Sequence, residues 1–84
     1  MKRIDVIGII IEKNRKMADE VQKLLSENAE IIQGRMGIPN IQNDIYIISV
    51  VIKAENERIS ALTGKLGRLN NVSVKAAITN VEVE

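Results

Sequence analysis

The sequence predicts an α+β domain in which two β-α-β units share one antiparallel sheet. Strand-like runs rich in Ile and Val alternate with segments of helical periodicity in the order βαββαβ, so each half of the chain supplies one unit. The 84 residues are 45% apolar and 27% charged, which suits one small globular domain covering residues 1–84. Two right-handed units interleaved in one sheet give the strand order 4-1-3-2 with both helices on one face, a ferredoxin-like sandwich.

The first half of the pattern begins with a strand over Arg3–Glu12, which is dense in Ile and Val. A helix follows it. Asn14 is suited to cap that helix because its side chain can accept from free backbone N–H groups, and Asn28 marks its end. The apolar residues between them recur at i, i+4, i+7 and i+8, as on one face of a helix: Met17, Val21, Leu24 and Leu25.

Two further strands occupy the middle of the chain. Ile31–Pro39 is the first of them, and we expect Pro39 to end it because proline cannot donate to a β-ladder. Residues 40–43 form the connecting loop. The other strand, Asp44–Lys53, is again rich in β-branched residues.

The second helix is expected to begin at Asn56 as its cap and to close at Asn70-Asn71, since Asn tolerates the left-handed conformation of a helix exit. The residues at its apolar spacing are Ile59, Leu62, Leu66 and Leu69. Apolar and polar residues then alternate over Val72–Thr79, which predicts a half-buried strand. No partner is predicted for residues 80–84.

Both faces of the two central strands are apolar, although the helices can cover only one of them. An exposed patch of that size is unusual in a monomer, and a small domain gains burial by oligomerising. We therefore expect a homo-oligomer, either a dimer or a tetramer. Alternatively, long side chains on the edge strands, such as those of Gln33, Arg35 and Lys75, shade the patch. The residues assigned to the oligomer face are Ile7, Ile9, Ile11, Tyr46, Ile48 and Val50.

The candidate ligand-binding residues lie in the second strand, where two glycines flank an arginine. They are Gly34, Arg35, Met36 and Gly37, and the next candidate is Lys65 in the second helix. Glycines leave the backbone open to close approach, and the planar guanidinium of Arg35 matches a carboxylate or a phosphate. We expect any ligand to be anionic or zwitterionic and to lie near a subunit boundary. The alternative is a β-bulge with an ordinary edge arginine.

Two other basic segments have weaker claims. The cations Lys13, Arg15 and Lys16 stand at the start of the first helix, where free N–H groups can hold an anion, although exposed charges there more commonly face solvent. The segment Thr63–Arg68 contains Gly-Lys but lacks the P-loop spacing, so it is not a phosphate loop. Its two glycines instead suggest close packing of the helix on the sheet.

The composition excludes several classes of function. With no Cys and no His, the chain has no disulfide, no thiolate or imidazole metal site, and no cysteine nucleophile or histidine base. No carboxylates pair as acid and base, so neither catalysis nor a cofactor is expected. A net charge of +1 and a single aromatic residue disfavour direct nucleic-acid binding. The apolar runs are too short to span a membrane, which leads us to expect a cytoplasmic protein.

Several segments, including the two strings G-R-M-G and T-G-K-L-G-R-L, carry a resemblance to a known family: Arg3–Ile10, Ile32–Pro39, Leu62–Leu69 and Val72–Lys75. From Arg3 to Thr79 the chain resembles the small regulators of the iron-only hydrogenase system, which are similar to ACT domains and to the effector domain of nickel-responsive repressors. This resemblance implies the βαββαβ topology, oligomeric assembly and a non-enzymatic regulatory or ligand-sensing role. The nickel ligands of those repressors are His and Cys, so their metal site does not carry over.

Two functional hypotheses follow from the residues and the resemblance together. The first is a homo-oligomeric, ACT-like regulatory module that binds a small molecule or a partner protein. The second is a structural accessory subunit without a ligand, which acts through its sheet face or edge. An interface cleft lined by Arg35 or Lys65 would favour the first hypothesis.

Overall fold

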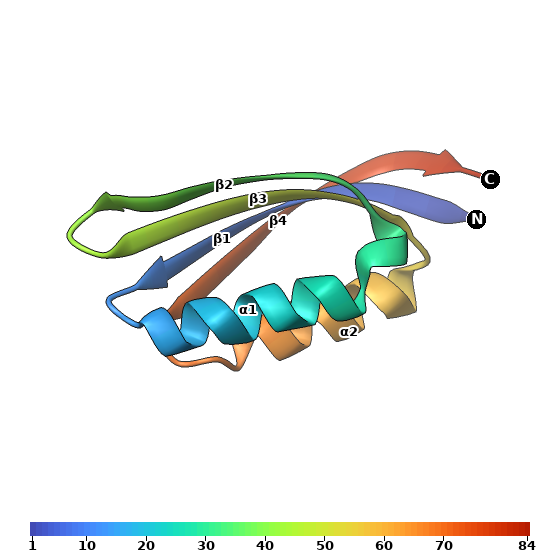
Figure 1. Cartoon of the computed structure of the whole chain (residues 1–84). Coiled ribbons are helices and arrows are strands. Elements are labelled where there is room, and N and C mark those ends of the chain that lie inside the picture. Colours follow the sequence, from blue (N-terminus) through green and yellow to red (C-terminus); the bar gives the residue numbers. More distant parts are fainter.

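A computed structural model describes residues 1–84 and shows one four-stranded antiparallel sheet with both long helices on one face (Figure 1). The strand order is β2-β3-β1-β4, which confirms the predicted topology. The elements in chain order are β1 (Lys2–Glu12), α1 (Arg15–Glu27), the short 3-10 helix η1 (Ala29–Ile31), β2 (Ile32–Gln42), β3 (Ile45–Ala54), α2 (Asn56–Gly67) and β4 (Val72–Val83).

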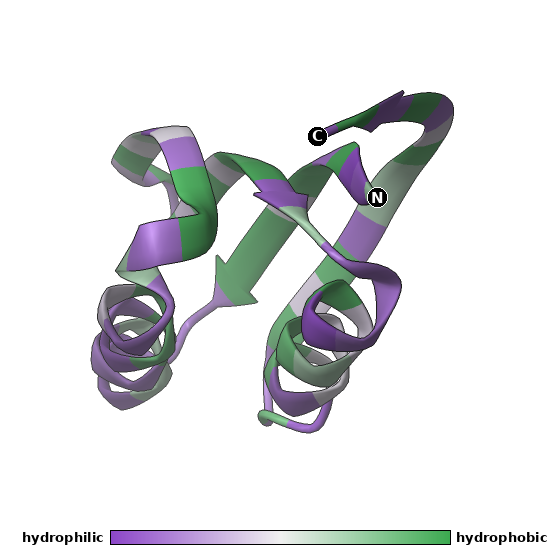
Figure 2. Ribbon diagram, turned by 90° about the vertical axis from the view of Figure 1, so that its right-hand side faces the viewer, coloured by the Kyte–Doolittle hydropathy of each residue, from purple (hydrophilic) through white to green (hydrophobic).

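The hydrophobic core lies between the sheet and the two helices. Successive side chains of a strand point to opposite faces, so alternate residues of β1 and β3 meet the apolar stripes of α1 and α2. In Figure 2 a broad green strand runs through the middle of the sheet, while the helices carry both purple and green. The core cluster has 13 buried residues: Ile7, Ile9, Ile11, Val21, Leu25, Ile31, Ile48, Val50, Ile52, Ala54, Ile59, Leu62 and Leu66.

The oligomer face predicted from the sequence is assigned to the wrong side of the sheet. Five of its six residues (Ile7, Ile9, Ile11, Ile48 and Val50) belong to the core under the helices, and the sixth, Tyr46, is partly buried against that core. Both alternating sets in β1 and β3 are apolar, so the sequence does not show which set the helices cover. The uncovered face instead carries the other set, including Val6, Ile10 and Val51, which are 40%, 41% and 36% exposed.

Most strand ends lie within one residue of the sequence prediction, but β2 and β4 extend several residues further. β2 continues past Pro39 to Gln42. It is an edge strand that pairs only with β3, and its register shifts between Ile38 and Gln42, so the missing N–H of proline is tolerated there. β4 extends to Val83, and its last residues pair with the start of β1 through Lys2↔Val83 and Arg3↔Glu82.

The N-cap of α1 is as predicted, whereas the N-cap of α2 is not. The Asn14 side chain accepts a hydrogen bond from the Met17 N–H at 3.1 Å, and Asn28 is the C-cap of α1. In α2, Glu55 occupies the N-cap position without a side-chain hydrogen bond, and Asn56 is the first residue of the helix. This helix and its cap therefore begin one residue earlier than expected.

A buried ion pair holds the start of β1. Asp5 is 0% exposed and is the only buried charged residue; its two carboxylate oxygens accept hydrogen bonds from Nε and Nη2 of Arg3, both at 2.9 Å. The hydrogen bond to Asp5 raises the pKa of Arg3, which therefore stays protonated throughout the pH range of a folded protein. Beside this pair β4 shifts register, and the Thr79 hydroxyl donates to the Ile4 carbonyl at 2.8 Å. The hydrogen bond from Thr79 thus joins the C-terminal part of β4 to the start of β1.

Candidate functional site

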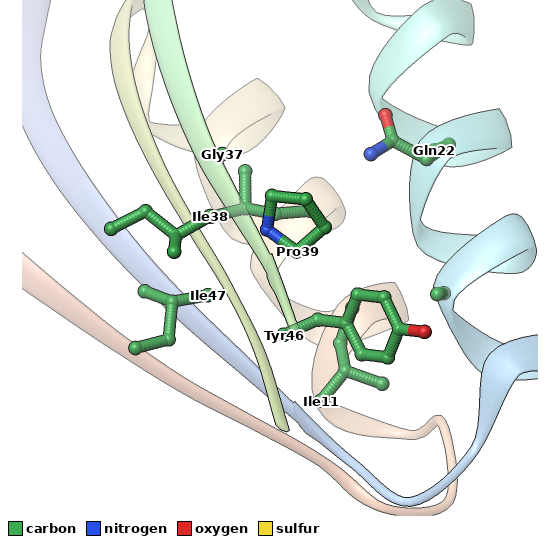
Figure 3. Close-up of a pocket in the computed structure, with 9 residues that line it drawn as sticks. Ile11, Gln22, Gly37, Ile38, Pro39, Tyr46 and Ile47 are labelled. Atoms are coloured by element: carbon green, nitrogen blue, oxygen red, sulfur yellow. The ribbon is translucent and has the colours of Figure 1, made fainter. Parts of the chain in front are cut away.

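A cleft of about 170 Å³ opens between α1 and the β2–β3 pair (Figure 3). It exists because β2 is exposed along nearly its whole length, whereas α1 packs over the inner part of the sheet. Its lining is mainly apolar and consists of Ile11, Ala18, Gln22, Gly37, Ile38, Pro39, Tyr46, Ile47 and Ile48.

Strands β2 and β3 form one wall of the cleft. Their opposite side is part of the open face of the sheet, which the helices do not cover. In Figure 3, Tyr46 and Ile11 extend toward α1, whereas Ile38 and Ile47 extend from the opposite side of the strands. Ile38 and Ile47 are register partners on β2 and β3, so their side chains lie on the same face of the sheet.

Three polar side chains are available at the cleft. Tyr46 brings a phenol into it and Gln22 brings a carboxamide from α1. Arg35, on β2, donates through Nη2 to the Gln22 Oε1, so its guanidinium lies at the rim. An apolar hollow with a phenol, an amide and a guanidinium can hold a small molecule by its apolar part and orient its anionic group.

The structure brings together only part of the predicted ligand site. Gly37 lines the cleft, and Arg35 reaches it through Gln22. Gly34 and Met36 pair with Val51 and Ser49, which places them with the residues of the open face. Lys65 is exposed on α2, which packs mainly against β4 at the opposite edge of the sheet from β2. Lys65 therefore does not share a site with Arg35.

The glycines of these segments are not required by close packing. A Cβ at Gly34 would meet nothing within 4 Å, and the same is true of Gly64 and Gly67, so the expected close approach of α2 to the sheet is wrong. Gly34 instead follows a shift of register between β2 and β3, as the β-bulge alternative predicted. Only Gly37 retains a place in the cleft.

Sequence reasoning missed Gln22 and gave Tyr46 a different role. Tyr46 is the single aromatic residue of the chain. It lies two residues before Ile48 in the same strand, so both side chains point to the same face of the sheet. Because the helices cover Ile48, Tyr46 also faces the helices. Gln22 lies four residues after Ala18, on the edge of the apolar stripe of α1, and nothing in the sequence alone distinguishes it from other exposed polar residues.

Tyr46 also borders a second hollow of about 300 Å³ at the start of α1, with Lys13, Asn14, Arg15 and Asp44. The Lys13 N–H donates to the Asp44 carbonyl at 3.0 Å, which ties the first strand–helix turn to the β2–β3 hairpin. Two of the three predicted basic residues are therefore together here, and Lys16 is not among the lining residues.

Two negative findings concern the chain as a whole. No group of three or more potential metal-ligating side chains gathers in the structure. None of the helices has the length and apolar character that crossing a bilayer requires.

Comparison with known proteins identifies a related structure and others of the same fold. The uncharacterized protein TM1266 from Thermotoga maritima is 35% identical, with a TM-score of 0.89 over 95% of this chain and 100% of that one. The ACT domain of GTP pyrophosphokinase from Chlorobium tepidum shares the fold at 19% identity, with a TM-score of 0.67 over 99% and 93% of the two chains. No curated protein sequence matches.

A third structure with this fold is the apo form of CPII, a nitrogen regulatory PII-like protein from Thiomonas intermedia K12. It is 15% identical, with a TM-score of 0.56 over 92% of each chain. At the level of sequence, a family model described as "TM1266-like: Iron-only hydrogenase system regulator, putative" matches residues 3–76. The chain therefore belongs to the TM1266-like family.

Proposed function

We propose that this protein is a non-enzymatic regulatory module that binds a small anionic or zwitterionic molecule in the cleft between α1 and β2. The description of its family supports a regulatory role in the iron-only hydrogenase system. The fold supports the same class, since an ACT domain and a nitrogen regulatory PII-like protein have it as well.

The size and lining of the cleft favour a ligand smaller than a nucleotide. Its 170 Å³ lie below the roughly 300–1,000 Å³ of ordinary small-molecule sites. CPII, which shares the fold, has been solved with ADP, AMP and bicarbonate bound, and ADP and AMP would exceed this cleft. A short carboxylic or amino acid with an apolar side chain fits better, because its apolar part can contact Ile11 and Pro39 while its carboxylate reaches Arg35.

The side chains of the cleft support binding without chemistry. The lining contains no carboxylate, and Tyr46 is its only ionisable residue. Asp5, the one buried carboxylate, is held by Arg3 at the other end of β1. General acid–base catalysis is most often carried by an imidazole or a carboxyl group, and the cleft contains neither.

The observation that carries the proposal is the contact between Arg35 and Gln22, which places a guanidinium at the rim of the cleft. A thermal-shift screen against amino acids and short-chain carboxylates, followed by calorimetry on each hit, tests it. We expect at least one compound to bind, and Arg35→Ala to weaken its binding about 10- to 100-fold through loss of a charge-assisted hydrogen bond.

Lys65→Ala is the matched control, since it removes an exposed cation far from the cleft and should leave the affinity unchanged. Equal affinity of wild type and Arg35→Ala for a confirmed ligand would show that the site is placed wrongly. If no compound of the panel binds, the ligand-binding proposal fails and the accessory-subunit hypothesis is favoured.

A further inference from the structure

We propose that two copies of this chain pair through the open face of the sheet, with the strands of one copy antiparallel to those of the other. The open face is the side away from the helices. On β1, β2 and β3 its large apolar residues are Ile4, Val6, Ile10, Met36, Ile38, Ile45, Ile47 and Val51. This inference does not depend on ligand binding in the cleft and is tested separately.

The apolar residues of the open face form one continuous patch. Cross-strand pairing sets Val6 beside Val51 and Ile10 beside Ile47, and Ile47 is in turn the partner of Ile38 on β2. Met36 is 62% exposed and Ile38 39% exposed. Scattered apolar residues are normal on a surface, but a patch that spans three adjacent strands marks an interaction site.

The dimensions of the whole open face fit a second copy. Four strands about 4.8 Å apart and about 37 Å long give a face of about 700 Å². A standard protein interface covers about 800 Å² on each partner, so nearly the whole face has to be used. A self-complementary two-fold contact does this, because each copy presents the same face to the other.

The centre of the open face has no large side chain. Gly8 is paired with Ser49, so the two smallest residues that the central strands present on the open face lie side by side. A Cβ at Gly8 would meet only the Lys75 carbonyl oxygen, at 3.8 Å, so packing within one chain does not demand glycine there. Close approach of a second sheet supplies a reason for it.

The charges at the two ends of the face select the antiparallel arrangement. Glu12 lies at one end of the β1–β3 pair, and Lys2 and Lys53 belong to the other end. None of the three forms an ion pair within the chain, whose only pairs are Arg3–Asp5 and Arg58–Glu30. A two-fold axis across the strands sets Glu12 of each copy over the far end of β1 in the other, beside Ile4 and its register partner Lys53.

The parallel arrangement is disfavoured by the same charges. With the two-fold axis along the strands, the two lysine-bearing ends would meet each other, and like charges would face across the interface. Lys75, on the edge strand β4, is a register partner of Gly8 and lies at the rim of the patch in either arrangement. It therefore does not distinguish them.

Sedimentation velocity at micromolar concentration tests the surface. We expect a dimer for the wild type and a folded monomer for Val6→Lys, because this side chain is already 40% exposed in the subunit and the substitution does not disturb the core. Ile78→Lys is the matched control, since Ile78 is 66% exposed on the opposite side of the sheet, and it should remain dimeric. A monomeric wild type, or a dimer that Val6→Lys leaves intact, would overturn the proposal; the latter would indicate pairing through a strand edge.

Zero-length cross-linking with a carbodiimide tests the arrangement, since the reagent condenses a carboxylate and an amine with loss of water. Within one chain, Glu12 pairs with Ile45, eight residues along β3 from Lys53, so these two side chains lie about 25 Å apart and cannot be joined directly. In a mixture of ¹⁴N- and ¹⁵N-labelled protein, we expect a Glu12–Lys53 cross-link that joins one chain of each label. Its absence from a proven dimer would refute the antiparallel arrangement.

Discussion

Ile9 and Ile10 are neighbours in β1, yet the fold uses them for different purposes. Ile9 is fully buried under the helices, while Ile10 is 41% exposed on the open face. Their chemistry is the same, so only the direction of the side chain separates a residue that stabilises the subunit from one that is free to meet a partner.

Alanine at these two positions should therefore have unequal effects on stability. Ile9→Ala is expected to lower the free energy of unfolding by about 2–5 kcal/mol, because it leaves a cavity in the core. Ile10→Ala should change the free energy of unfolding of the isolated subunit by less than about 1 kcal/mol. Urea denaturation at a concentration where the protein is monomeric measures both. Equal losses would mean that the two faces are assigned wrongly.

At the scale of elements, the two helices begin in different ways. Asn14 caps α1 through its side chain, whereas Glu55 holds the cap position of α2 with suitable extended backbone (φ −74°, ψ 156°) but without a side-chain hydrogen bond. The shorter Asp, Ser and Asn side chains accept from the first-turn N–H groups more readily than Glu does. α2 is therefore the helix whose N-terminus can be improved.

Substitutions at the two caps should act in opposite directions. Asn14→Ala is expected to lower the free energy of unfolding by about 1 kcal/mol, and Glu55→Asp to raise it by up to about 1 kcal/mol. Thermal unfolding monitored by circular dichroism is sufficient to measure both. A stabilising Asn14→Ala would contradict the cap seen in α1.

The ion pair between Glu30 of η1 and Arg58 of α2 predicts a specific pH dependence. The hydrogen bond from Arg58 lowers the pKa of Glu30, so the pair stabilises the fold above the ordinary pKa of 4.5, and this contribution is lost as the pH falls through the lowered value. Glu30→Gln should therefore reduce the melting temperature slightly at pH 7, and the difference from wild type should disappear in acid. A difference that persists at pH 2 would show that the substitution acts by another route.

Local sequence pattern explains which elements could be predicted and which features could not. With no cysteine to form a disulfide that could override this pattern, periodicity alone located all four strands and both long helices. It failed where tertiary position decides: Pro39 is tolerated because β2 is an edge strand, and Tyr46 faces the cleft because the helices cover its side of the sheet. The contact between Arg35 and Gln22 depends on how α1 lies across the sheet, which no spacing in the sequence encodes.

At the scale of the whole molecule, the cleft and the open face lie on opposite sides of the same β2–β3 pair. Pro39 and Tyr46 belong to the cleft, while the side chains of Ile38 and Ile47 belong to the open face. A ligand that draws β2 toward α1 would shift the rim of the open face as well. This gives a regulatory module a physical route from ligand binding to assembly, provided that the ligand binds the two assembly states with different affinity.

The most direct test of the account is to map a ligand onto the chain by NMR. Amide spectra of ¹⁵N-labelled protein, titrated with a short-chain carboxylate or amino acid that raises its melting temperature, report which residues change environment. We expect the largest shifts at Gln22, Gly37 and Tyr46, and their loss in Arg35→Ala but not in Lys65→Ala. Shifts confined to α2 around Lys65, or spread over the surface with no cluster at the cleft, would contradict the account.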